Sequence, residues 1–202
     1  MQVKFLITTS IGILANTLIC AADTADCTST YPSIQRPNNF NDDACDDAVR
    51  VFTPEEIKRV LSTWALLYSN RSETAMDIFL RGFDTSPEFR QYVLKDHYIS
   101  RNDIPKDKNI KKQSLRTVDT INIVVNSLSH VDAVENYLTY IGKLHKGFGI
   151  EKHNFEDFKE CSLFVFRKRL NQSGHHFSQE DNIVWNKVFD VILEYIFKGY
   201  ED

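Results

Sequence analysis

His145 is the residue whose type and setting could support the most specific chemistry in this chain. The apolar residues before it recur at helical spacing: Val134, Tyr137, Leu138, Ile141 and Leu144. On a helix these positions share one side, so the imidazole of His145 stands at the end of an apolar stripe. A histidine in apolar surroundings can offer a neutral ring nitrogen to a metal, including the iron of haem. The same spacing also suits a histidine that is simply packed in a core, so both interpretations stay open here.

Polar side chains recur at helical spacing in the preceding helix, which is predicted over residues 110–127. They are Gln113, Arg116, Thr117 and Thr120. The other side of this helix carries the apolar residues Val118, Ile121, Val125 and Leu128. Such a polar strip is either an ordinary solvated surface or a row of hydrogen-bonding groups that lines a binding site.

Other patterns that could do chemistry are weak. His153, His175 and His176 have no metal-ligand spacing with carboxylates, and we expect them to be solvated. The chain lacks a Cys-x-x-Cys-His sequence, so covalent attachment of haem is not indicated. It also lacks a Ser/His/Asp, phosphate-loop or zinc motif, and we assign no catalytic residue.

The elements that would position these side chains are predicted to be helices. Thr53-Pro54-Glu55-Glu56 combines an N-cap, a proline at the first helical position and a capping-box glutamate. The helix that follows is expected to bury Ile57, Val60, Leu61, Trp64 and Leu67. Further helices are predicted over 73–83, 87–92, 110–127, 131–147, 152–170 and 178–197, with 94–109 as a polar surface connection. Six long or medium helices and one short one make an all-α domain.

The N-terminal residues 1–22 read as a secretory signal peptide. Lys4 precedes an apolar run that ends in the small residues before the expected cleavage after Ala22. A retained signal anchor is the alternative, and no other segment is apolar enough to cross a bilayer. Residues 23–51 are then an acidic extension, and residues 52–202 form the folded domain. We expect a secreted, extracellular protein that has no membrane contact after cleavage.

In an oxidising compartment, Cys27 and Cys45 are the natural disulfide pair. They would close a loop of about 19 residues and contribute roughly 3 kcal/mol. Cys161 remains, either as a small buried apolar residue or for pairing with another chain. Asn70 and Asn171 begin glycosylation sequons. The net charge of −4 gives no basic footprint for nucleic acid, and a homo-oligomer is compatible with the sequence.

Taken together, these landmarks resemble the globins, with neuroglobins and nematode globins nearest in pattern. The resemblance covers about residues 52–200. It rests on Glu55-x8-Trp64, on Phe79-x3-Phe83-x3-Pro87, on Leu138-x2-Ile141-Gly142-x2-His145-x4-Ile150-x4-Phe155 and on Trp185. It implies a globin fold, a three-over-three sandwich of six to seven helices that binds haem b without a covalent bond.

The resemblance also implies a role for each site residue. His145 would be the proximal iron ligand, and an ungapped count places Gln113 at the distal position, where its amide can donate a hydrogen bond to dioxygen. Arg116 would pair with a haem propionate or reach the ligand, unless it is a solvated cation, and Thr117 would stand where an aliphatic residue is usual. The apolar residues expected to surround the haem are Phe79, Ile141, Leu144, Ile150, Phe155 and Phe158.

The chain departs from the family pattern at one position. Six residues after the matching proline, where globins carry a phenylalanine against the haem, this chain has Val93, with Tyr92 beside it. Either Tyr92 packs on the haem after a one-residue slip, or the wedge is the smaller Val93. The smaller wedge would weaken haem retention by about 1 to 2 kcal/mol.

These features leave three functional hypotheses. The first is a secreted haem globin that binds dioxygen or another diatomic gas reversibly, for transport, storage or supply. The second is a haem-dependent oxidoreductase or sensor that handles nitric oxide, nitrite or superoxide, which the polar strip and the missing phenylalanine favour. The third is a globin-like binding domain without haem. Whether the protein is an enzyme therefore stays open.

Overall fold

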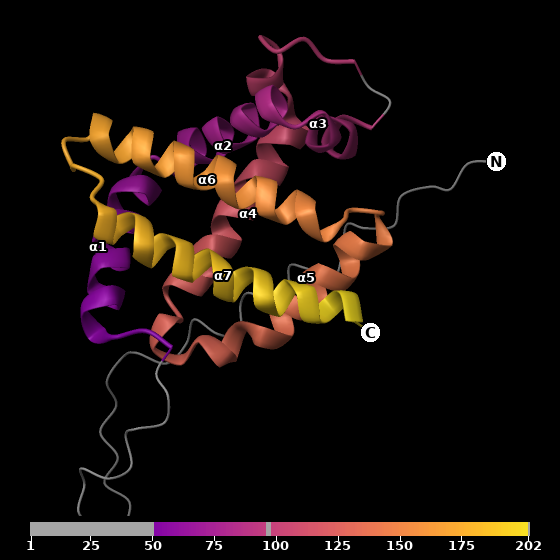
Figure 1. Cartoon of the computed structure of the whole chain (residues 1–202). Helices are drawn as coiled ribbons and strands as arrows, with labels where there is room; N and C mark the ends of the chain where they lie inside the picture. Colours follow the sequence, from indigo (N-terminus) through magenta and orange to yellow (C-terminus); the bar gives the residue numbers. More distant parts are fainter. Residues whose placement is uncertain (1–50, 96–97, 202) are drawn as a thin grey trace, which may run out of the picture. The chain divides into compact units, whose positions relative to one another are not determined.

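The computed structural model describes residues 51–95 and 98–201, and the described residues are helical with no strand. The helices are α1 (Pro54–Ser69), α2 (Arg71–Thr85), α3 (Pro87–Leu94), α4 (Lys108–Val125), α5 (Glu135–Gly147), α6 (Lys152–Gln172) and α7 (Gln179–Glu201), with the short 3₁₀ helices η1 (Ile104–Lys106) and η2 (Leu128–Val134). In Figure 1, α6 and α7 run side by side across the front, and α4 passes behind them. The predicted all-α architecture is confirmed.

The start of α1 follows from its capping residues. The Thr53 hydroxyl accepts from the Glu56 amide at 3.2 Å, and the Glu56 carboxylate accepts from the Thr53 amide at 2.7 Å. The same carboxylate accepts from Lys187 Nζ at 2.9 Å, so the cap also fastens α1 to α7. One residue of the predicted apolar stripe is wrong: Leu61 is 40% exposed, because α1 packs through Val60, Trp64 and Leu67 instead.

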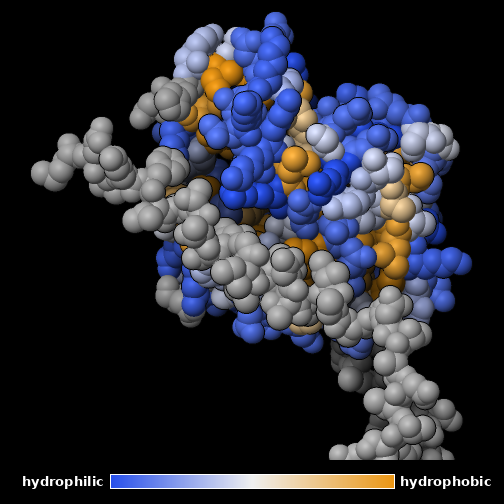
Figure 2. Space-filling view, turned by 180° about the vertical axis from the view of Figure 1, so that it is seen from behind, coloured by the Kyte–Doolittle hydropathy of each residue, from blue (hydrophilic) through white to orange (hydrophobic). Residues whose placement is uncertain are grey.

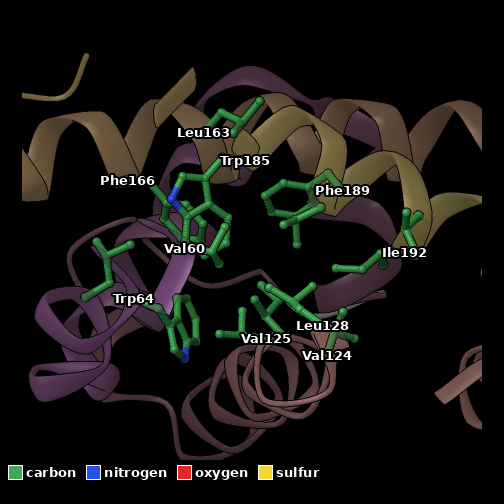
Figure 3. Packing of buried hydrophobic residues seen from close by; sticks show 14 of the residues in the cluster. Val60, Trp64, Val124, Val125, Leu128, Leu163, Phe166, Trp185, Phe189 and Ile192 are labelled. Carbon is green, nitrogen blue, oxygen red and sulfur yellow. The ribbon is translucent and has the colours of Figure 1, made fainter. Parts of the chain in front are cut away.

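The main core gathers apolar residues from α1, α4, η2, α6 and α7, as Figure 3 shows. Two indoles lie within it, and both of their N–H groups find a partner. Trp185 Nε1 donates to the Thr63 hydroxyl at 3.0 Å, and Trp64 Nε1 donates to the Asn122 side-chain oxygen at 2.9 Å. Because an unpaired buried donor is costly, these bonds let the two indoles fill the core without a penalty.

A second apolar cluster lies around α2, α3 and η1, with Phe79, Phe83, Leu94, Ile104 and Ile110 at its centre. Phe89 of α3 packs edge-on against both Phe79 and Phe83, with ring centroids 5.3 Å apart in each pair. The predicted surface connection over 94–109 is wrong in part, because Leu94 and Ile104 are buried in this cluster. An isolated isoleucine between polar neighbours gave no periodic signal.

Helices α5 and α7 cross at two glycines, Gly142 and Gly199. A Cβ at Gly142 would clash with the Ile196 carbonyl, and one at Gly199 would clash with the Thr139 carbonyl. Beside the crossing, the Thr139 hydroxyl donates to the Tyr195 carbonyl at 3.2 Å. Only residues without a side chain allow the two backbones to approach this closely. The position of α5 relative to the core is therefore set by α7.

Replacing Gly142 by alanine should destabilise the fold by about 1 to 3 kcal/mol, because backbone atoms of α7 would have to move. Gly147, the last residue of α5, is the matched control: an added Cβ there meets nothing within 4 Å. Gly147→Ala should be neutral or slightly stabilising. Urea unfolding of both variants measures the free energy change, and equal values for the two would contradict the crossing argument.

Candidate functional site

His145 lies in the last turn of α5, where its ring is fixed by the helix itself. Nδ1 lies 2.8 Å from the Ile141 carbonyl oxygen. Since a carbonyl oxygen can only accept, Nδ1 carries the proton and Nε2 keeps a free lone pair. Within residues 51–95 and 98–201, Nε2 has no hydrogen-bond partner. It is not fully buried either, since no fully buried side-chain nitrogen or oxygen in these ranges lacks a partner. The ring thus presents one unoccupied acceptor nitrogen.

The surroundings of His145 keep this nitrogen neutral. The Phe155 ring meets the imidazole edge-on at 5.2 Å between centroids, and Phe148 does so at 6.4 Å. Burial lowers the pKa of His145 below its ordinary value, and the hydrogen bond to the Ile141 carbonyl opposes that shift only in part. A neutral imidazole with a free Nε2 is the form that coordinates a metal.

The chain turns sharply after His145 and then enters α6. The amides of Phe148 and Ile150 both donate to the His145 carbonyl, at 3.0 and 3.1 Å. Gly149 adopts a φ of +77°, a backbone conformation that residues with a side chain rarely adopt. Tyr200 of α7 then donates its hydroxyl to the Ile150 carbonyl at 2.7 Å. We call residues 148–154 the corner. Its first residues are held by the two bonds to the His145 carbonyl.

The predicted apolar residues divide between the two clusters. Ile141 and Phe155 pack against the main core, whereas Phe79 and Val93 belong to the second cluster. Phe158 packs against both clusters. Leu144 and Ile150 are half-buried. The structure therefore places Phe155 directly beside His145, and Phe158, one turn further along α6, joins the two clusters.

Tyr92 and Val93 have different partners. The Tyr92 hydroxyl donates to the Gly149 carbonyl at 2.8 Å, which joins α3 to the corner. Val93 packs with the second cluster. Which of the two meets a bound molecule stays a prediction, but only Tyr92 has a polar role here.

The polar strip of α4 is exposed at Gln113 and Arg116 and half-buried at Thr117 and Thr120. The Thr120 hydroxyl lies 3.2 Å from the Tyr137 hydroxyl of α5. Both helices extend from this contact away from their connection, η2. Along their own helices, Gln113 lies about 10 Å and His145 about 12 Å from this contact. Within the described ranges, no hydrogen bond or ion pair joins α4 to α5 at that end.

Of the remaining histidines, His153 and His176 are exposed, as predicted, whereas His175 is half-buried. The exposed His153 nevertheless has a partner, because its Nε2 lies 2.8 Å from Glu88. His175 lies 2.9 Å from the buried carboxylate of Asp181. Both partners are far away or on another element, so sequence spacing could not reveal them. No group of at least three His, Cys, Asp or Glu side chains suited to a metal occurs in the part of the chain that the structure describes.

The remaining predicted positions can be placed briefly. Cys161 is buried and free, and its thiol lies 3.4 Å from the Thr85 hydroxyl. Asn70 and Asn171 are exposed, although the Asn171 side-chain oxygen accepts from the Phe177 amide. Cys27, Cys45 and the signal segment lie outside the described residues. No described helix is both long and apolar enough to cross a membrane.

Surface features add little to the site. Hydrophobic residues reach the surface at several places on the face opposite to that of Figure 1, as Figure 2 shows. An open pocket of about 580 Å³ lies elsewhere, between α2, α6 and α7, and none of the predicted site residues lines it. Its walls include charged side chains of both signs, Arg81 and Glu160 among them. The candidate site therefore rests on His145 and its neighbours.

Comparisons with known proteins agree on one family. The family model described as Globin matches residues 76–196. Cytoglobin-1 of Oryzias latipes is 29% identical over 97 residues, which are 48% of this chain and 55% of that protein. Cytoglobin-2 of Oryzias latipes is 23% identical over 150 residues, covering 73% and 82% of the two chains. Cytoglobin-2 of Danio rerio is 24% identical over 146 residues, covering 71% and 79%.

A solved structure shows the same fold. It is that of a hexacoordinated haem protein from an anhydrobiotic tardigrade at pH 4, and it matches with a TM-score of 0.68 and 16% identity. The match covers 75% of this chain and 96% of that chain. At this identity the likeness concerns the fold, which agrees with the predicted helical sandwich.

Protonation of His145 should destabilise the ligand-free chain in acid. Because its folded pKa is lowered, the unfolded chain takes up the proton first as the pH falls. The stabilising contribution is complete above the unfolded pKa of about 6.5 and is lost as the pH falls through the lower folded pKa. Urea unfolding from about pH 8 to about pH 5 should show the wild type losing stability relative to His145→Leu. A difference independent of pH would contradict the burial of a neutral ring.

Proposed function

Because the chain belongs to the globin family, we propose that it is a haem globin that binds a diatomic gas, with dioxygen as the expected ligand. The observation that supports this proposal most directly is the unoccupied Nε2 of His145, held neutral at the end of α5. The cofactor would be haem b bound without a covalent link, as the sequence indicates.

The residues present fit that cofactor. A histidine that served only as a core residue would be expected to use both nitrogens or to lie fully inside, yet Nε2 of His145 has no partner in the described ranges. Half-buried apolar side chains next to it, such as Leu144, Ile150 and Phe155, would gain burial against a flat apolar ring. His145 would supply the axial nitrogen, and the apolar side chains would exclude water.

When bound, a ferrous haem would supply reversible binding of dioxygen, carbon monoxide or nitric oxide. The chain itself contributes orientation and polarity. The Ile141 carbonyl fixes the imidazole plane and holds its proton at Nδ1, which raises the basicity of Nε2. On the α4 side, the Gln113 amide can donate a hydrogen bond to a ligand, which contributes on the order of 1 kcal/mol, up to tenfold in affinity.

Arg116 and Thr117 extend the polar side of the site. The Arg116 guanidinium is exposed and forms no hydrogen bond or ion pair with the described residues, so it is available for a haem propionate. Thr117 already donates its hydroxyl to the Gln113 carbonyl at 3.1 Å. The Thr117 hydroxyl is therefore bonded to the backbone within α4, and it contacts a ligand only if that bond is given up.

A redox or sensing role is the second candidate, and the exposure of Gln113 and Arg116 favours it. Water that reaches this side of the site would favour oxidation over reversible gas binding. A haem-free binding domain is the third candidate. Spectra separate the three: a stable reduced form that responds to gas exchange, rapid oxidation to a stable ferric form, or no Soret band at all.

Loading the purified protein with haem tests the proposal. The wild type should show a Soret band at one haem per chain that shifts when the reduced protein meets carbon monoxide. His145→Gly should lose most of the band, because the axial nitrogen is gone, and free imidazole added to that variant should restore it.

The matched control is His176→Gly, since His176 is exposed and forms no side-chain bond among the described residues. It should load haem like the wild type. Equal loading by both glycine variants would show that His145 is not the ligand, and a wild type without a Soret band would refute the haem globin itself.

We also propose that the protein is secreted, with cleavage after Ala22 and a Cys27–Cys45 disulfide. Support comes from the signal-like N-terminal segment and from the two cysteines in the acidic extension. Expression in a eukaryotic secretory host should yield a chain in the medium that begins at Asp23. Alkylation of the denatured, unreduced protein should then label Cys161 alone. An uncleaved N-terminus in the membrane fraction would support the retained anchor instead.

A further inference from the structure

Helix α3 is joined to the corner by polar contacts that the sequence did not suggest. The Tyr92 hydroxyl donates to the Gly149 carbonyl at 2.8 Å. The Glu88 carboxylate accepts from the Asn154 amide group at 2.6 Å and lies 2.8 Å from His153 Nε2. All of these bonds link one short helix to residues 149–154. Of the site residues predicted from the sequence, Tyr92 takes part in these bonds.

Helix α3 has apolar contacts as well as these polar bonds. The Phe89 ring stacks on Phe158 at 6.4 Å between centroids and packs so close to Gly82 that a side chain there would clash with it. Near the end of the helix, Val93 and Leu94 pack in the second cluster. Tyr92 lies one turn after Phe89 and Glu88 one residue before it, and both bond to the corner. The helix is therefore held by apolar contacts to the second cluster and by a set of polar bonds that can open.

The corner is in turn part of the His145 site. The amide of Ile150 donates to the His145 carbonyl, so the corner is bonded directly to the backbone of His145. Two tyrosines from different helices bind consecutive carbonyls there: Tyr92 binds Gly149 and Tyr200 binds Ile150. Burial raises the pKa of Tyr200 to about 12, and the nearby Tyr92 adds to the rise, which agrees with their proximity.

We propose that the bonds from Tyr92 to Gly149 and from Glu88 to His153 and Asn154 form a clasp that closes α3 on the corner and slows haem exchange. Tyr92 and Glu88 are positioning residues in this view, since they act through the corner and not on a ligand. The inference rests on the proposed haem function. The clasp offsets the small Val93 wedge, because retention then depends on closure of the helix more than on the area of one side chain.

The clasp should weaken as the pH rises through the raised pKa of His153. Hydrogen bonding to Glu88 raises the pKa of His153, and Glu151 and Asp157 add to this attraction. The charged contact is thus complete below the unfolded pKa of about 6.5 and is lost as the pH rises through the higher folded pKa.

The experiment measures the rate at which the haem-loaded, full-length protein releases haem to an excess of an apoprotein acceptor. Tyr92→Phe should release haem about three- to tenfold faster, as expected for one lost hydrogen bond. Tyr140→Phe is the control, because Tyr140 is 52% exposed and its hydroxyl has no bond to the described residues. It should release haem at the wild-type rate.

A second variant tests the charged half of the clasp. Wild-type release should accelerate as the pH rises through the His153 pKa, and Glu88→Gln should remove this dependence and release haem at the faster rate throughout. A merely structural role would change unfolding without changing the pH profile. Normal loading with unchanged release in Tyr92→Phe and an unchanged profile in Glu88→Gln would overturn the clasp alone. Failure of the wild type to load haem would refute the proposed function and the clasp with it.

Discussion

One ring nitrogen fixed by the backbone is the interaction on which the rest of the site depends. Because Nδ1 of His145 donates to the Ile141 carbonyl, the direction of Nε2 is set by α5, and the Phe155 ring packs against the imidazole from α6. The helix must then be placed accurately, and α7 does this. The glycine crossing brings the backbones of α5 and α7 together. The Lys198–Glu135 ion pair at 2.6 Å joins the same two helices. An error at this crossing would turn the imidazole as well as weaken the fold.

The division of the apolar residues into two clusters explains why binding at His145 would involve more than one helix. Phe155 and Ile141 belong to the main core, whereas Phe79 and Val93 belong to the cluster around α3, and Phe158 is shared. A flat apolar molecule beside His145 would meet Phe155, and Phe158, one turn further along α6, packs against both clusters. Its burial would couple the docking of α3 to the larger core, since each cluster would gain apolar contact through the same molecule. The polar bonds of α3 to the corner act on that coupling.

The parts that sequence could predict are those that depend on local spacing. The capping box at Thr53, the helix that carries His145 and the glycines after it are properties of neighbouring residues, and the structure has them. Leu61 was wrongly predicted to be buried, because the apolar stripe assigned to α1 was one position too wide. Ile104 is buried and Phe89 half-buried through contacts with other elements, and His153 pairs with Glu88 across 65 residues. Such long-range partners follow from how the helices pack, which one sequence read without relatives does not contain.

The contrast between the two sides of the site bears on what the protein can do there. The His145 side is apolar and fixed, whereas the α4 side is polar and exposed at Gln113 and Arg116. Among the described residues, the Thr120–Tyr137 contact is the polar link between α4 and α5, and it lies at the end away from these groups. Under the proposed haem function, a hydrogen bond from Gln113 would gain strength only where water is excluded. Access of water to the α4 side, rather than the identity of the histidine, would then decide between reversible gas binding and redox chemistry.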